Sequence, residues 1–245
     1  MNERDLYKIG GVAAVTIAVM YLIALLIYIP AYRAGPPPSN VTEWFTLFER
    51  DWLTGLFFLG LADAVIMVLW VPLSLALYSV LKQVSRTWLT IVMPLVFIGI
   101  AVFLATNIAF SMLSLSTQYE AATTESQRSL LLAAGQGLLA ISQGTGVYVG
   151  MPLVWFAGLM ISIITLRSNS FGRVSAYVGI VGFGLLLVGV PFATYTTTGS
   201  MTVVVVAIVA VSYLGGGILS LIWYVLVGLR LYKLGYFEDK ALVQG

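Results

Sequence analysis

Three consecutive segments decide the fold: LTGLFFLGLADAVIMVLWVPLSLALYSVL (residues 53–81), KQVSRT (82–87) and WLTIVMPLVFIGIAVFLATNIAFSM (88–112). A bilayer core about 30 Å thick requires roughly 20 mostly apolar residues in helical form. Both apolar runs are longer than that, and six residues with two basic side chains separate them. Because the connection is so short, we expect the two runs to be antiparallel neighbours in a helix hairpin.

Four more stretches of this kind flank the hairpin. Lipid offers no hydrogen-bond partner to free peptide groups, so each stretch must be helical. The first is longer than the apolar part of a signal peptide and lacks a small-residue cleavage site, so we expect it to be retained. The sequence predicts an all-α, polytopic membrane helical bundle, one integral-membrane domain over residues 1–245 with six transmembrane helices at 9–30, 53–81, 88–112, 144–166, 174–195 and 202–229.

The composition excludes several other classes of protein. Of 245 residues, 60% are hydrophobic and 9% charged, whereas soluble chains average roughly 25% charged residues. A disordered chain and a nucleic-acid-binding protein are therefore not expected. There is no histidine and no cysteine, which removes most metal and haem ligation and most nucleophilic catalysis. We predict no metal, no cofactor and no catalytic residue.

The distribution of positive charge predicts the orientation. If both chain ends lie on one side, nine of the twelve basic residues share that side, and Arg33, Arg50 and Arg128 lie on the other. Cytoplasmic loops carry the excess of lysine and arginine. Both termini are therefore predicted to be cytoplasmic.

Two further helices are predicted on the outer side. After the first span, Asn40 precedes Glu43 by three residues, an N-terminal capping signature. An amphipathic helix at the membrane surface should follow, with these residues on its apolar face: Val41, Trp44, Phe45 and Phe48.

The second outer helix precedes the fourth span. Thr124 and Gln127 form a capping box, so this helix should begin near Glu125. Residues 125–166 would measure roughly 63 Å as one straight helix, too long for one crossing. We expect a break near 144–146, and a horizontal or re-entrant helix over 125–140.

Asp63 is the acidic residue inside an apolar span. An unpaired carboxylate in hydrocarbon costs several kcal/mol, so it must be protonated, paired or in contact with water. A functional role and a neutral, packed carboxyl group both fit, because no lysine or arginine lies within a span.

Further polar residues are predicted in the outer half of the membrane. Together with Asp63 they favour an outward-facing polar cavity, although interhelical hydrogen bonds worth about 0.6 kcal/mol each are the alternative. The candidate ligand-binding residues are Asp63, Asn107, Gln136, Gln143, Tyr148 and Tyr195.

Small residues recur at four-residue spacing in the fourth and sixth spans. Such stripes let helix backbones approach closely. Packing within the bundle is the favoured interpretation, and a homo-oligomer or membrane-protein partner is the alternative. The residues are Gly146, Gly150, Ser212, Gly216 and Ser220.

Three segments carry a resemblance to a known family: YEAATTE (119–125), SFGR (170–173) and WYVLVGLRL (223–231). With them, most of the chain resembles a broad family of uncharacterised prokaryotic multi-span membrane proteins, classed as a domain of unknown function. The resemblance implies a prokaryotic plasma membrane and a six-span fold. It implies no catalytic residues.

The favoured function is therefore non-enzymatic: an outward-facing cavity that binds a small or amphiphilic ligand, for sensing or transport. A structural or accessory subunit of a larger membrane complex is the alternative. A lipid-modifying intramembrane enzyme is least favoured, because a single buried carboxylate offers little acid–base chemistry. The expected partners are the lipid bilayer and that ligand, and no nucleic acid.

Overall fold

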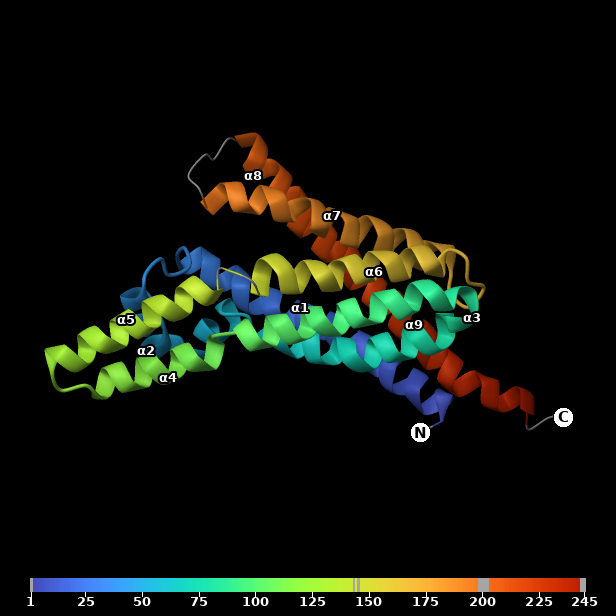
Figure 1. Cartoon of the computed structure of the whole chain (residues 1–245), viewed down its shortest axis with the longest axis horizontal. Helices are drawn as coiled ribbons and strands as arrows, with labels where there is room; N and C mark the ends of the chain where they lie inside the picture. The colour runs from blue at the N-terminus through green and yellow to red at the C-terminus, as the bar shows by residue number, and fades with distance from the viewer. Residues whose placement is uncertain (1, 143, 145, 198–202, 243–245) are drawn as a thin grey trace.

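The chain is helical between short turns in the computed structural model, which describes residues 2–142, 144, 146–197 and 203–242. No strand occurs in this part of the chain, and the long elements lie roughly side by side (Figure 1). In chain order the elements are α1 (Glu3–Ala34), α2 (Val41–Phe58), α3 (Leu61–Thr106), α4 (Ala109–Ala121), α5 (Glu125–Ser142), η1 (Gly146–Gly150), α6 (Met151–Thr165), α7 (Arg173–Thr197), α8 (Val203–Ala210), η2 (Val211–Gly215) and α9 (Gly216–Leu242).

Within the described residues, five helical stretches are long and apolar enough to cross a membrane. They are Glu3–Ala34, Val41–Ala121, Glu125–Thr165, Arg173–Ala193 and Val203–Tyr236. The second of them reverses direction at Ser85, where φ is −159° and ψ is 79°. The protein is therefore an all-helical, multi-pass membrane bundle, and the predicted spans 53–81 and 88–112 both fall within one long stretch.

The sequence predicts one continuous helix for each of those two spans, but both helices are interrupted. The first is broken between α2 and α3, where Gly60 adopts a left-handed conformation with φ of +87°. The second is broken between α3 and α4 at Asn107 and Ile108. The break predicted at 144–146 is confirmed, since α5 ends at Ser142 and η1 begins at Gly146.

The predicted amphipathic helix is the first part of α2, and it begins as expected. The backbone N–H of Glu43 donates to the Asn40 side chain over 3.0 Å. Its apolar face packs on other helices of the chain, against Ile108 and Met112 near the start of α4 and Leu139 of α5. The sequence predicts that this face lies against the membrane surface, but its main contact is with other helices of the same chain.

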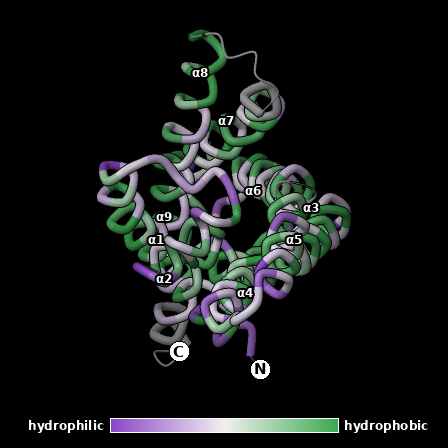
Figure 2. The backbone as a smooth tube through the Cα atoms, turned by 90° about the vertical axis from the view of Figure 1, so that its left-hand side faces the viewer, coloured by the Kyte–Doolittle hydropathy of each residue, from purple (hydrophilic) through white to green (hydrophobic). Residues whose placement is uncertain are grey.

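The second outer helix begins at Glu125 as predicted, with a capping box in which the N–H of Gln127 donates to Thr124 over 3.3 Å. It lies against α4, and the pair projects beyond the end of α1 (Figure 1). The two helices can pack together because α4 continues helically to Ala121. A horizontal or re-entrant placement of α5 in the membrane stays a prediction. Figure 2 shows hydrophilic stretches on α4 and α5, whereas α7 and α8 are mostly hydrophobic.

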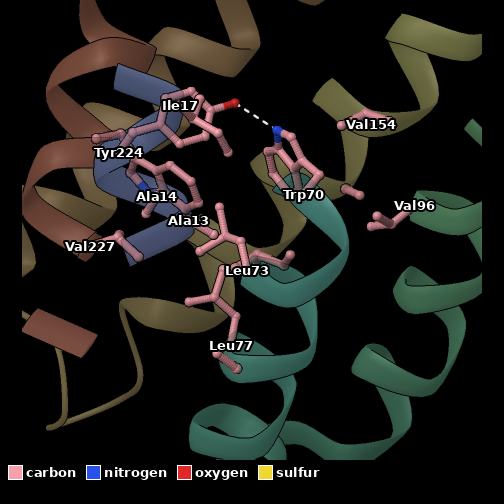
Figure 3. Packing of buried hydrophobic residues seen from close by; sticks show 14 of the residues in the cluster. Ala13, Ala14, Ile17, Trp70, Leu73, Leu77, Val96, Val154, Tyr224 and Val227 are labelled. Carbon is pink, nitrogen blue, oxygen red and sulfur yellow. Dashed lines mark hydrogen bonds between the residues drawn. The ribbon is translucent and has the colours of Figure 1, made fainter. Parts of the chain in front are cut away.

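The core of the bundle lies where α1, α3, α6, α7 and α9 meet. The indole N–H of Trp70 donates to the hydroxyl of Tyr224 over 2.8 Å (Figure 3). Trp70 also stacks on Trp223, with ring centroids 6.1 Å apart, and all three side chains are almost fully buried. A buried polar tip with a partner is the usual arrangement for tryptophan and tyrosine, and this contact joins α3 to α9.

The small residues of the fourth span face α3. A Cβ on Gly150 would lie 3.0 Å from the carbonyl oxygen of Gly99 and from the amide nitrogen of Phe103. One turn earlier, Gly146 lies against Thr106. The close approach occurs within one chain.

The stripe near the start of α9 faces α7 in the same way. A Cβ on Gly216 would lie 2.9 Å from the carbonyl oxygen of Gly182, and one on Gly182 would lie 3.0 Å from the amide nitrogen of Ser220. A Cβ on Gly189 would lie 2.9 Å from that of Ser212. Both stripes thus bring helices of the same chain together.

Gly11 tests this close packing where α1 crosses α9. A Cβ there would lie 2.8 Å from the backbone nitrogen of Tyr232 and 2.9 Å from the carbonyl oxygen of Gly228. Backbone cannot move aside as a flexible side chain can, so Gly11→Ala should lower the free energy of unfolding by roughly 1–3 kcal/mol. The control is Gly184→Ala, because no such atom lies within 4 Å of that position. Thermal unfolding in one detergent compares them, and equal midpoints would contradict the tight crossing.

Candidate functional site

The three helix breaks converge on one cavity of about 170 Å³. Its wall combines the end of α2, both ends of α3, the residue before α4, the end of α5 and the start of η1 and α6. Regular helices leave no free peptide groups between them, so broken helices at one level are a feature of membrane binding sites. The lining residues are Phe58, Leu59, Gly60, Asp63, Phe103, Thr106, Asn107, Ile108, Ser142, Gly146, Val147 and Met151.

Asp63 lies in the first turn of α3 and lines this cavity. The break at Gly60 makes Asp63 the third residue of α3, so it is not in the middle of a helix. A helix N-terminus carries a partial positive charge that stabilises a carboxylate. Among the described residues, no side chain or backbone group donates a hydrogen bond to the Asp63 carboxylate.

The side chain of Asn107 links the break between α2 and α3 to the break between α3 and α4. Its amide nitrogen Nδ2 lies 3.2 Å from the carbonyl oxygens of both Leu59 and Gly60, to which it donates. Its oxygen Oδ1 accepts from the N–H of Ala109 over 3.2 Å. The side chain thus completes peptide groups that the interrupted helices leave open, which membrane proteins require.

The remaining polar groups of the cavity are hydrogen-bond acceptors. Thr106 donates its hydroxyl to the carbonyl of Val102 over 2.8 Å, and Ser142 donates to that of Leu139 over 2.9 Å. Their donors are used within their own helices, but the lone pairs stay available. With no lysine or arginine in the wall, the cavity combines one carboxylate with apolar walls and suits a group that donates hydrogen bonds or carries positive charge.

The structure brings together two of the six residues predicted for ligand binding, Asp63 and Asn107. Gln136 is exposed on α5, and Tyr148 is half-buried in η1; neither lines the cavity. Gln143 lies outside the described residues, as does the side chain of Tyr195.

Sequence reasoning missed the aromatic wall of Phe58 and Phe103 and the hydroxyls of Thr106 and Ser142. Gly60 could have signalled the first break, because a glycine inside an apolar run allows the left-handed turn found there. Nothing in the sequence separates Phe58 or Phe103 from other aromatic residues of the spans.

The described residues contain no group of three or more acidic side chains that could hold a metal ion. In the cavity wall, Asp63 is the single charged side chain.

The fold and the cavity define a class: a multi-pass helical membrane protein with interrupted helices around an acidic cavity. The chain belongs to the family described as Domain of unknown function (DUF4386), which covers residues 9–228. This confirms the resemblance to an uncharacterised family. No curated protein and no solved structure matches the chain.

Asn107→Ala tests the joint between the broken helices. The substitution removes the donor to two carbonyl oxygens away from bulk water, and an unpaired buried group costs about 1–3 kcal/mol. We expect the free energy of unfolding in detergent to fall by that amount. Gln136→Ala, which removes an exposed amide from α5, is the control; an equal effect of both variants would show that the joint does not depend on Asn107.

Proposed function

We propose that the chain crosses the membrane six times with both termini in the cytoplasm. The reversal at Ser85 supports two crossings within the long helical stretch, since 61–84 and 86–106 would measure about 36 Å and 31 Å as helices. Each length matches a bilayer core of about 30 Å. The prokaryotic cell membrane is the location that the family resemblance implies.

The grouping of positive charge supports this orientation. Lys82, beside the reversal, pairs with Glu3 at the start of α1. Arg230 of α9 donates to the carbonyl oxygen of Ser170 in the α6–α7 connection. The basic ends therefore gather at one end of the bundle, and the excess of lysine and arginine assigns that end to the cytoplasm. The cavity then lies in the outer half.

At this cavity we place the function: binding of a small or amphiphilic ligand, for sensing or transport and without catalysis. The observation that carries the proposal is that three helix interruptions surround the one carboxylate within the spans. Interruptions are costly in lipid and occur where protein covers them or where they line a cavity. The amide of Asn107 already donates to the carbonyl oxygens of Leu59 and Gly60. Asp63 is therefore the group that we expect to meet a ligand.

The ligand class follows from the charge and size of the cavity. A volume of about 170 Å³ corresponds to roughly five or six water molecules at about 30 Å³ each. One carboxylate, acceptor hydroxyls and apolar walls favour an ammonium or amine head group with a short apolar tail.

Asp63→Asn tests this proposal with two probes, hexylammonium and the matched neutral molecule hexanol. A charge-assisted hydrogen bond is worth about 1.5–3 kcal/mol, so the native protein should prefer hexylammonium by about tenfold or more. Asp63→Asn should abolish the preference while the chain stays folded. Titration calorimetry in detergent measures both affinities.

Glu120→Gln, an exposed acid on α4, is the matched control and should keep the preference. An equal affinity of the native protein for both probes would contradict the proposal, as would a preference that survives in Asp63→Asn.

A second candidate, an accessory subunit, is favoured by α8. None of its residues is buried, and Val203 is 86% exposed. The end of α7 and α8 diverge from the other helices (Figure 1), so another membrane protein or a second copy could cover them. This role needs no ligand at Asp63, and the two probes separate the candidates.

A further inference from the structure

A second hollow, independent of the Asp63 cavity, lies between the end of α1 and α2. It has a volume of about 460 Å³ and is formed by the last turns of α1, the proline-rich connection and one face of α2. Part of its wall is apolar and includes Leu26, Ile27, Pro30 and Phe58. Two charged side chains, Arg50 and Asp51, also line it. We refer to it as the α1–α2 groove.

The two charges of the groove are of opposite sign and adjacent in the chain, so Arg50 also attracts the Asp51 carboxylate. In the described part of the chain the ion pairs are Lys82–Glu3 and Arg128–Glu125, and Arg50 belongs to neither. Asp51 interrupts α2 and is fixed by Thr54, whose N–H and hydroxyl donate to its two oxygens over 3.1 and 2.6 Å. Each carboxylate oxygen keeps a lone pair for another donor.

The surroundings of the groove mark it as the level of lipid head groups. Tyr32 and Trp52, next to it in the sequence, are 57% and 55% exposed, and tyrosine and tryptophan concentrate at membrane interfaces. On the side of the membrane core, α1 exposes a row of aliphatic side chains, among them Leu22, Ile23 and Leu26. A molecule seated here would meet charges at one end and a long apolar surface at the other.

We infer that the α1–α2 groove binds a phospholipid with a zwitterionic ethanolamine head group. The phosphate carries one negative charge and suits Arg50, whose guanidinium matches phosphate oxygens. The primary ammonium donates hydrogen bonds and suits Asp51. The acyl chains follow the exposed aliphatic side chains of α1. An anionic lipid of the same chain length would meet Arg50 equally well but would also face the Asp51 carboxylate.

The two hollows are neighbours that share one residue, Phe58. Its ring stacks on that of Tyr28, with centroids 5.6 Å apart and planes at 4°. Tyr28 is fixed in turn by donating to the carbonyl of Phe57 over 2.8 Å. The stacked ring of Phe58 is therefore part of the wall of both hollows. The charged residues of the groove do not line the cavity, so the proposed lipid binding does not require a ligand at Asp63.

The experiment is native mass spectrometry of the full chain in mild detergent, titrated with phosphatidylethanolamine and phosphatidylglycerol of identical acyl chains. Interactions of exposed charges are modest, at most about 1 kcal/mol. The native protein should therefore bind phosphatidylethanolamine about three- to fivefold more tightly than phosphatidylglycerol. Arg50→Gln should weaken the binding of both lipids by a similar factor. Asp51→Asn should remove the preference, and the fold should persist because asparagine also caps helices well.

Arg33→Gln is the matched control, because Arg33 is an exposed arginine in the last turn of α1 that does not line the groove. It should leave both affinities unchanged. Equal binding of the two lipids by the native protein would overturn the inference, as would an effect of Arg33→Gln equal to that of Arg50→Gln. A dimer without lipid would assign the groove to a second copy. None of these results would alter the test with hexylammonium.

Discussion

A peptide group in hydrocarbon has no water to bond with, so a helix that stops inside a bilayer leaves costly open groups unless protein completes them. The chain stops helices at three places on one level, and the Asn107 side chain completes two of them by donating to Leu59 and Gly60. Gly60 supplies the left-handed turn that an L side chain rarely adopts. The cavity, the position of Asp63 and the docking of α2 on α4 all depend on this joint.

The joint also explains how a carboxylate is accommodated within apolar spans. An acid in the middle of a continuous helix would have no nearby positive charge here, since no basic residue lies within a span. At the start of α3 it meets the partial positive charge of a helix N-terminus and a hollow large enough for a few water molecules. The same arrangement that keeps Asp63 in place leaves it without a hydrogen-bond donor among the described residues, and this is why we propose that it meets a ligand.

Much of the fold could be predicted because it follows from hydropathy and local signals. Apolar length predicted the membrane helices, and capping residues predicted the helix starts after Asn40 and Thr124. The breaks at Gly60 and Asn107 were not predicted, because hydropathy is nearly the same whether or not the backbone turns within an apolar run. The apolar face around Trp44 and Phe45 was assigned to the membrane surface because an amphipathic helix has the same pattern on lipid as on other helices.

The site was less predictable than the fold. Asp63 and Asn107 stand out as polar residues in apolar runs, but Phe58, Thr106 and Ser142 join them only because distant segments meet at the breaks.

We propose that the level of the three helix breaks faces outward and is reached by water. Because the chain has no native cysteine, single introduced cysteines can test this directly. In intact cells, a thiol reagent that cannot cross the membrane should label Ser142→Cys, and it should label Gln83→Cys only after the membrane is opened. Labelling of Gln83→Cys in intact cells, or protection of Ser142→Cys until the membrane is opened, would contradict the proposed orientation.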